Sequence, residues 1–287
     1  MTSNATRETV EVRRTLRAVD GIRFPMLSSG PAEGSEAVVL LHGNPGSCED
    51  WRHLASVVGR FARCVAFDQP GFGRASKPAR FDHSYTGHAR HLGRVLDALG
   101  IRRAHLVGND LGARWMLDWA EQSPGRVASA VTVAGGVLLD YRWHYLARIW
   151  RTPVLGEFFM ATPSRRIFRM LLDKDEPRPL PRVFLDRMYD DMDHATRRAI
   201  LSLYRPAFDW NARSHDLSRA LREQDIPALV VWGARDRYIP VEQADRQRET
   251  LPSAETVVLP DSGHWPHVDN PEGVASAVVP FLQRHLG

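Results

Sequence analysis

The sequence predicts an α/β protein with a doubly wound, mostly parallel sheet. Short continuous apolar runs recur along the chain, and runs of this length are typical of strands buried on both faces of a parallel sheet. Segments of helical length with a period near 3.6 lie between them, and such alternation implies right-handed crossover connections. The apolar runs are 37–41, 64–67, 105–107, 127–133, 228–232 and 256–259.

A hairpin is expected before the first of these runs. Val10 and Val12 alternate with charged residues, Asp20-Gly21 is a turn dipeptide, and alternation resumes over 22–26. The helices expected between the later strands and at the end of the chain are 85–99, 113–122, 241–251 and 271–285.

One long segment interrupts the alternation of strands and helices. Residues 137–214 show aromatic, arginine-rich helical patterning over 142–150, 164–172, 182–189 and 195–204, without a clear strand. The sequence therefore predicts a core domain of residues 1–136 and 215–287, with 137–214 inserted as a helical lid (cap). Such a lid would cover the carboxyl edge of the sheet, where ligands bind in α/β proteins. The alternative is a helical subdomain that only adds stability.

Composition excludes several classes of protein. The chain has 287 residues, 43% of them hydrophobic and 25% charged, which is ordinary for a globular protein. Its longest nearly uncharged apolar run, 128–139, is shorter than the ~20 residues that span a bilayer. Residues 1–14 lack the apolar stretch of a secretory leader, so no membrane association and a cytoplasmic location are expected.

The charged and sulfur-containing residues do not indicate a macromolecular or metal ligand. The net charge is +4, but the arginines are scattered among acids, which disfavours nucleic-acid binding. Cys48 and Cys64 are the two cysteines, and they lack metal-ligand spacing with the histidines. We expect reduced cysteines, no metal, no cofactor and a small-molecule substrate. The assembly state is left open between a monomer and a homodimer.

The sharpest motif is Gly108-Asn109-Asp110-Leu111-Gly112, between an apolar strand and a helix. It has the pattern of a nucleophile elbow, with aspartate where serine is more usual. The flanking glycines leave room for a tight strand-to-helix turn that exposes the central side chain. The alternative is a simple helix N-cap, a role that aspartate readily takes.

An acid and a histidine follow the elbow after two later strands. Asp236 follows the strand 228–232, and His264 follows the strand 256–259. The carboxyl ends of parallel strands share one edge of the sheet, so Asp110, Asp236 and His264 should meet there. The chain order nucleophile, acid, histidine is that of α/β hydrolases.

With these motifs the chain resembles α/β hydrolases of the epoxide hydrolase and haloalkane dehalogenase branch over essentially its whole length. The resemblance implies the α/β-hydrolase fold, Asp110 as nucleophile, and His264 oriented by Asp236. It also implies an oxyanion hole from the backbone N–H groups of Asn44 and Leu111. The matching segments are His42-Gly43-Asn44-Pro45, Trp51, Asp68-Gln69-Pro70-Gly71-Phe72-Gly73, Trp232-Gly233 and Gly263-His264, with His267 as a structural match.

An aspartate nucleophile implies a particular chemistry. An ionised carboxylate needs no base at neutral pH, unlike a serine hydroxyl. Attack of Asp110 on an sp³ carbon would give an alkyl-enzyme ester, which water activated by His264 would then hydrolyse. The expected substrate is apolar and small to medium in size. The Asn44–Pro45 bond, in the turn beside this site, is a candidate for the cis form.

Epoxide hydrolysis to a vicinal diol is the preferred reaction. Leu203-Tyr204-Arg205 resembles the lid motif of epoxide hydrolases, so Tyr204 is the candidate acid for the opening oxygen. The second lid tyrosine of that family is absent from 149–153, and the tyrosines that could replace it are Tyr141, Tyr145 and Tyr189.

Two other activities stay open. A haloalkane dehalogenase would bind halide through Asn44 and a tryptophan after the nucleophile, but position 111 is leucine, which leaves Trp150 or Trp143 of the lid as donor. A haloacid dehalogenase would use two arginines, of which only Arg114 is matched. The third possibility is a relative that binds a small ligand without turning it over.

Overall fold

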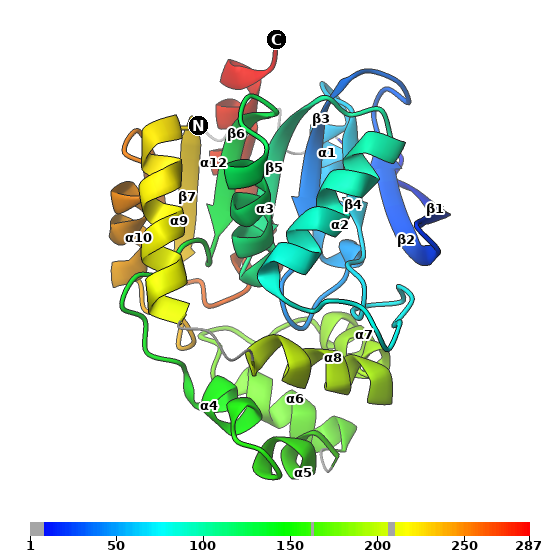
Figure 1. Ribbon diagram of the computed structural model, residues 1–287, viewed down its shortest axis with the longest axis vertical. Coiled ribbons are helices and arrows are strands. Elements are labelled where there is room, and N and C mark those ends of the chain that lie inside the picture. The colour runs from blue at the N-terminus through cyan, green and yellow to red at the C-terminus, as the bar shows by residue number, and fades with distance from the viewer. Residues whose placement is uncertain (1–8, 162–163, 206–209) are drawn as a thin grey trace.

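The computed structural model describes residues 9–161, 164–205 and 210–287, and these form a doubly wound α/β sheet with a layer of helices at one edge (Figure 1). Within the described residues, eight strands form one sheet in the order β1-β2-β4-β3-β5-β6-β7-β8. The pairs from β4 through β8 are parallel, and β1-β2 and β2-β4 are antiparallel. The predicted fold class is therefore confirmed. The strands are β1 (Arg13–Val19), β2 (Ile22–Ser29), β3 (Glu36–Leu41), β4 (Cys64–Phe67), β5 (Arg103–Asn109), β6 (Val127–Val133), β7 (Ala228–Gly233) and β8 (Glu255–Leu259).

The parallel strands lie where the apolar runs predicted them, but the first arm of the hairpin was misplaced. The predicted arm relied on Val10 and Val12, whereas β1 begins at Arg13. The side chains of β1 are almost all exposed, because it is the edge strand. An exposed edge strand carries little apolar alternation, so its sequence gives little signal.

Helices cover both faces of the sheet because neighbouring residues of each strand point to opposite faces. Val39 of β3 packs in one buried cluster with Leu92 and Trp115, from helices α2 and α3. Leu40 packs in the other cluster with Phe281 of α12. The core helices are α1 (Arg52–Val58), α2 (Tyr85–Ala98), α3 (Leu111–Gln122), α9 (Trp210–Gln224), α10 (Glu242–Arg246), α11 (Pro266–Asp269) and α12 (Pro271–His285), with short 3₁₀ turns at Cys48–Trp51 and Gln247–Glu249.

Five helices form a separate layer beyond the carboxyl ends of the parallel strands (Figure 1). They lie in the segment predicted as a lid, and we call this layer the lid. The domain division itself stays a prediction, and its assigned boundary at 214 falls inside α9, which packs against α3. The lid helices are α4 (Tyr145–Arg151), α5 (Leu155–Ala161), α6 (Arg165–Asp173), α7 (Arg182–Asp191) and α8 (His194–Tyr204).

Candidate active site

Asp110 occupies a strained turn between β5 and α3. Its backbone has φ 50° and ψ −120°, a conformation that a non-glycine residue adopts only when its surroundings impose it. Gly112 permits the turn, since a Cβ there would lie 2.4 Å from the carbonyl oxygen of Leu41. The Asp110 side chain makes no N-cap hydrogen bond to α3, so the structure does not support the N-cap alternative.

The Asp110 carboxylate points at two backbone donors. The N–H of Asn44 donates to Oδ2 of Asp110 at 2.9 Å, and the N–H of Leu111 also favours the charged form of this carboxyl group. Asn44 lies in the turn after β3, and its bond to Pro45 is cis. Burial raises the pKa of Asp110, while His264 and the two N–H groups act against the rise. The predicted neighbours of Asp110 therefore surround it in the structure.

His264 lies between two carboxylates. Its Nδ1 is 2.8 Å from Oδ2 of Asp236, and its Nε2 is 3.9 Å from Oδ1 of Asp110. Oδ1 of Asp236 accepts N–H bonds from Tyr238 and Ile239, which fixes the carboxylate. The three residues predicted from separate loops thus meet at one edge of the sheet.

This arrangement favours a protonated histidine. Burial would lower the pKa of His264, but Asp236, Asp110 and Glu176 together raise it to about 9. At neutral pH the resting site then holds an imidazolium beside the Asp110 carboxylate. The Asp110 oxygen that faces His264 lies beyond hydrogen-bond distance of it.

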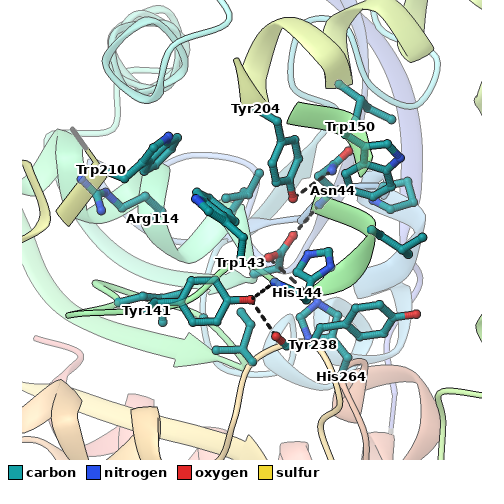
Figure 2. Close-up of a pocket in the computed structure, with 18 of the residues that line it drawn as sticks. Asn44, Arg114, Tyr141, Trp143, His144, Trp150, Tyr204, Trp210, Tyr238 and His264 are labelled. Atoms are coloured by element: carbon teal, nitrogen blue, oxygen red, sulfur yellow. Dashed lines mark hydrogen bonds and ion pairs between the residues drawn. The ribbon is translucent and has the colours of Figure 1, made fainter. Parts of the chain in front are cut away.

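Asp110 and residues of the lid line one pocket. Figure 2 shows His264, Tyr204 and Trp150 around it. The pocket contains about 100 Å³ of space accessible to water, and its walls are mainly apolar and aromatic. Tyr204, at the end of α8, is buried and directs its hydroxyl toward Asn44, whose Nδ2 donates to it at 3.4 Å. The rings of Trp143 and Trp150 pack edge-on against Tyr204, with centroids 5.4 and 5.0 Å away. The sequence analysis proposed four lid and turn residues for the site, and all of them line this cavity: Asn44, Trp143, Trp150 and Tyr204.

The three tyrosines considered as a second lid acid are engaged elsewhere. Tyr141 lines the pocket, but its hydroxyl donates to the carbonyl of Tyr238 at 2.7 Å. Tyr145 donates to Asp175 at 2.6 Å and does not line the pocket. Tyr189 packs against Phe168 and also lies outside the pocket lining.

His144 is a pocket residue that the sequence analysis missed. It caps α4, and its Nδ1 accepts the N–H of Ala147 at 3.2 Å. In a neutral ring this places the proton on Nε2, so His144 presents an N–H donor. Burial lowers its pKa to about 3, with a smaller contribution from His264, so the ring is neutral. A capping motif looks the same whether or not the ring also faces a cavity, so no sequence signal distinguishes this histidine.

Arg114 and His267 also have defined places. Nε of Arg114 pairs with Asp118 at 2.6 Å and Nη1 donates to Ser214 at 2.9 Å, while its buried Nη2 has no hydrogen-bond partner among the described residues. His267 stacks on Trp51 with centroids 4.4 Å apart, consistent with the structural role expected for it.

In the described ranges, no cluster of three or more potential metal-ligating side chains occurs. No helix among the described residues is both long and apolar enough to cross a membrane.

Comparison with known proteins identifies the family of the chain. A family model described as the alpha/beta hydrolase fold matches residues 36–271. The chain belongs to the α/β-hydrolase family. Its membership supports the coarse expectation of a hydrolase.

Two named relatives of this α/β hydrolase act on other substrates than those predicted. Both are named 2-hydroxy-6-oxononadienedioate/2-hydroxy-6-oxononatrienedioate hydrolase. The one from Burkholderia vietnamiensis is 29% identical over 92% of this chain and 93% of its own length. The one from Paraburkholderia phymatum is 30% identical over 87% of this chain and 88% of its own. These relatives do not single out the epoxide hydrolase and haloalkane dehalogenase branch.

Solved structures show the same fold. A haloalkane dehalogenase from Agrobacterium tumefaciens has a TM-score of 0.83 at 23% identity, covering 99% of this chain and 100% of that one. A 2-hydroxy-6-oxo-6-phenylhexa-2,4-dienoate hydrolase from a Rhodococcus species has a TM-score of 0.79 at 22% identity, covering 96% and 100%. At this identity the likeness concerns the fold alone.

Proposed function

We propose that this α/β hydrolase converts an epoxide to a vicinal diol through an alkyl ester on Asp110. The observation that carries the proposal is the nucleophile itself: a carboxylate at a strained elbow, with Oδ2 held by the N–H of Asn44 at 2.9 Å. A carboxylate attacks an sp³ carbon without a base and forms an ester, whereas a serine hydroxyl would need His264 for its first step. Asp236 and His264 are then left for the second step.

In the first step Oδ1 of Asp110 bonds to an epoxide carbon, and the carbon–oxygen bond of the ring breaks. The electron pair stays on the epoxide oxygen, which takes the proton of the Tyr204 hydroxyl. Burial raises the pKa of Tyr204 well above its ordinary value, so the proton is present at neutral pH. A positioned acid of this kind contributes roughly 10²- to 10⁴-fold to a rate.

A second donor for the epoxide oxygen is His144. Its Nε2–H is fixed by the hydrogen bond at Nδ1, and the ring lines the same pocket as Tyr204 (Figure 2). A neutral imidazole donates a hydrogen bond without giving up its proton, so His144 would stabilise the charge while Tyr204 protonates it. This pair would take the place of the two lid tyrosines of the epoxide hydrolase family.

The second step is hydrolysis of the ester. Loss of the Asp110 charge on alkylation removes one of the groups that keep His264 protonated. The imidazolium proton can then return to the Tyr204 oxygen through solvent, leaving His264 neutral. His264 takes a proton from water, whose oxygen attacks the ester carbonyl, and the N–H groups of Asn44 and Leu111 stabilise the oxyanion. The bond between the carbonyl carbon and the diol oxygen then breaks, and this oxygen takes the proton of the hydroxyl group that water delivered. The Asp110 carboxylate and the His264 imidazolium of the resting state remain.

The pocket indicates the substrate class. Aromatic side chains surround the reactive carboxylate, and the accessible space is small. An aryl or short alkyl epoxide would bury its apolar part against these rings, which favours binding by area removed from water.

A single turnover in ¹⁸O-labelled water tests the proposal. With excess enzyme and styrene oxide, hydrolysis at the ester carbonyl would place the label in the carboxyl group of Asp110, and peptide mass analysis would find it there. The diol from this first turnover would be unlabelled. Label in the diol and none in Asp110 would mean direct attack of water on the epoxide and would overturn the ester mechanism.

A dehalogenase is the second candidate because two buried donors near the pocket lack partners. They are Nε1 of Trp150 and Nη2 of Arg114, neither with a hydrogen-bond acceptor among the described residues. Trp150 would serve a halide, and Arg114 a substrate carboxylate. A panel of epoxides, haloalkanes, a haloacid and a 2-hydroxy-6-oxodienoate separates these reactions, and no turnover of any member would favour a ligand-binding relative.

A further inference from the structure

Two acids of the lid are buried against the catalytic loops. Asp175 and Glu176, between α6 and α7, are only 5% and 8% exposed, although Asp173 and Lys174 just before them are exposed. Burial of two adjacent carboxyl groups costs free energy unless both accept hydrogen bonds from their surroundings. Their contacts therefore indicate what this loop does.

Asp175 binds the loop that carries Asp236. Its Oδ2 accepts hydrogen bonds from the hydroxyls of Tyr238 at 3.2 Å and Tyr145 at 2.6 Å. The Tyr238 ring packs against the His264 ring, with centroids 5.1 Å apart. Asp175 thus links the lid to Tyr238, which packs against His264. Asp175 itself makes no hydrogen bond to His264 in the described structure.

Glu176 binds the catalytic histidine directly. Its Oε1 accepts the backbone N–H of His264 at 3.2 Å. Its Oε2 is buried and has no hydrogen-bond partner in the described part of the chain. Gly263 makes this approach possible, because a Cβ at that position would lie 1.9 Å from Oε2.

We propose that Glu176 is a positioning residue, by which the lid fixes the peptide of His264 for hydrolysis of the ester on Asp110. The inference rests on the proposed function for its kinetic consequence. Attack by water needs Nε2 of His264 to be aimed at the ester, whereas alkylation needs only Asp110 and the donors of the pocket. Loss of the Glu176 contact should therefore affect the second step more than the first.

The charges around Glu176 are consistent with a carboxyl group that is protonated near neutrality. Burial raises its pKa to about 8, His264 and its N–H oppose the rise, and Asp236 and Asp269 add to it. The Tyr238 hydroxyl donates to the neighbouring carboxylate of Asp175 at 3.2 Å. A neutral carboxyl group still accepts the N–H of His264 through its carbonyl oxygen. Glutamine keeps that acceptor, and alanine removes it.

Rapid-quench kinetics on Glu176→Ala and Glu176→Gln test the positioning role, with styrene oxide as substrate. In Glu176→Ala, ester hydrolysis should fall ~10-fold or more, since small misplacements of a catalytic group have large effects, while alkylation stays near the wild-type rate. Glu176→Gln should restore hydrolysis. Tyr145→Phe is the matched control: it loosens the same lid loop at Asp175 but leaves the contact with His264 in place.

An NMR titration of the His264 imidazole in the enzyme without substrate gives a readout independent of turnover. Both Glu176 variants should titrate at lower pH than the wild type, because Glu176, with a pKa of about 8, is ionised where His264 titrates, and its negative charge helps to raise the pKa of His264 to about 9. Equal slowing of both steps, or slow hydrolysis in Tyr145→Phe as well, would overturn the proposal. If the wild type forms no ester, the proposed function fails. The NMR titration still tests the positioning role in that case: an unchanged pKa of the His264 imidazole in both variants would count against an interaction between Glu176 and His264.

Discussion

The hydroxyl of Tyr204 lies 3.4 Å from Nδ2 of Asn44, so a lid residue contacts the turn that holds Asp110. The backbone N–H of the same asparagine donates to Oδ2 of Asp110 at 2.9 Å. Asn44 thus connects the candidate acid with the candidate nucleophile. Because the amide donates to Tyr204, the proton of the Tyr204 hydroxyl is free to point elsewhere, as protonation of a leaving oxygen requires.

Tyr204→Phe is expected to slow alkylation by an epoxide by ~10²-fold or more, because a positioned acid is lost. Ester hydrolysis should change much less, since it depends on His264. Stopped-flow fluorescence of the pocket tryptophans separates the two phases. The midpoint of urea unfolding should stay close to the wild-type value, because only a hydroxyl is removed. Equal alkylation rates in variant and wild type would reduce Tyr204 to packing of the lid.

Replacing His264 by glutamine should trap the ester. Alkylation needs no base, so the variant should still react once with an epoxide, whereas water would not be activated for the second step. Intact-mass measurement should show the protein heavier by one substrate molecule, and peptide analysis should place the addition on Asp110. An adduct on any other residue would contradict the assignment of the nucleophile.

Asp236→Asn should slow ester hydrolysis by ~10²-fold or more, because an amide neither supports the imidazolium nor fixes the tautomer as a carboxylate does. The carboxylate contacts Nδ1 of His264 at 2.8 Å, and it helps raise the pKa of His264 to about 9 against the effect of burial. Imidazole NMR should therefore show His264 of the variant losing its proton at lower pH. A larger effect on alkylation than on hydrolysis would argue against this orienting role.

Stability should fall as the pH drops from about 6.5 toward 4, in part through His91. Burial among aromatic rings lowers the pKa of His91 from its ordinary value of about 6.5 to about 4. The unfolded chain therefore binds the proton more tightly than the native state does. The resulting contribution of up to about 3 kcal/mol to the free energy of unfolding is fully present above pH 6.5 and is lost as the pH falls to 4. Urea unfolding of His91→Phe between pH 4.5 and 8 should show a shallower dependence than the wild type. His194→Gln, at an exposed histidine, is the control and should keep the wild-type slope.

The sheet and the catalytic residues of the core could be predicted because local rules determine them. Runs such as Cys64–Phe67 and residues 37–41 are apolar at every position, as a strand buried on both faces requires. Asp110, Asp236 and His264 lie in the loops that follow β5, β7 and β8, and parallel topology then brings them to one edge. The edge strand β1 was misplaced because exposed side chains obey no such pattern.

The lid contacts could not be predicted in the same way. Glu176 meets His264 across 88 residues of chain, and His144 faces the pocket because of how α4 docks on the core. Such contacts depend on the packing of helices against loops, for which the sequence has no periodic signal. The tyrosines considered as second acids were plausible by residue type, but Tyr145 and Tyr141 bind other partners.

The leaving group is decided by two conservative variants measured on two substrates. Residue 111 is leucine, whose side chain cannot donate a hydrogen bond, so a halide would depend on Asn44 and on the unpartnered indole N–H of the buried Trp150. We expect the wild type to convert styrene oxide to its diol and to release little halide from 1-chlorobutane. Trp150→Phe should then leave diol formation close to the wild-type rate, since it keeps the aromatic packing against Tyr204, whereas Tyr204→Phe should reduce it. The opposite pattern, halide release that is lost in Trp150→Phe and kept in Tyr204→Phe, with no diol from the epoxide, would assign the pocket to a dehalogenase. Tyr204→Phe removes only a hydroxyl, whereas Trp150→Phe also replaces a buried indole by a smaller ring, so urea unfolding of both variants is the control for the stability of the lid.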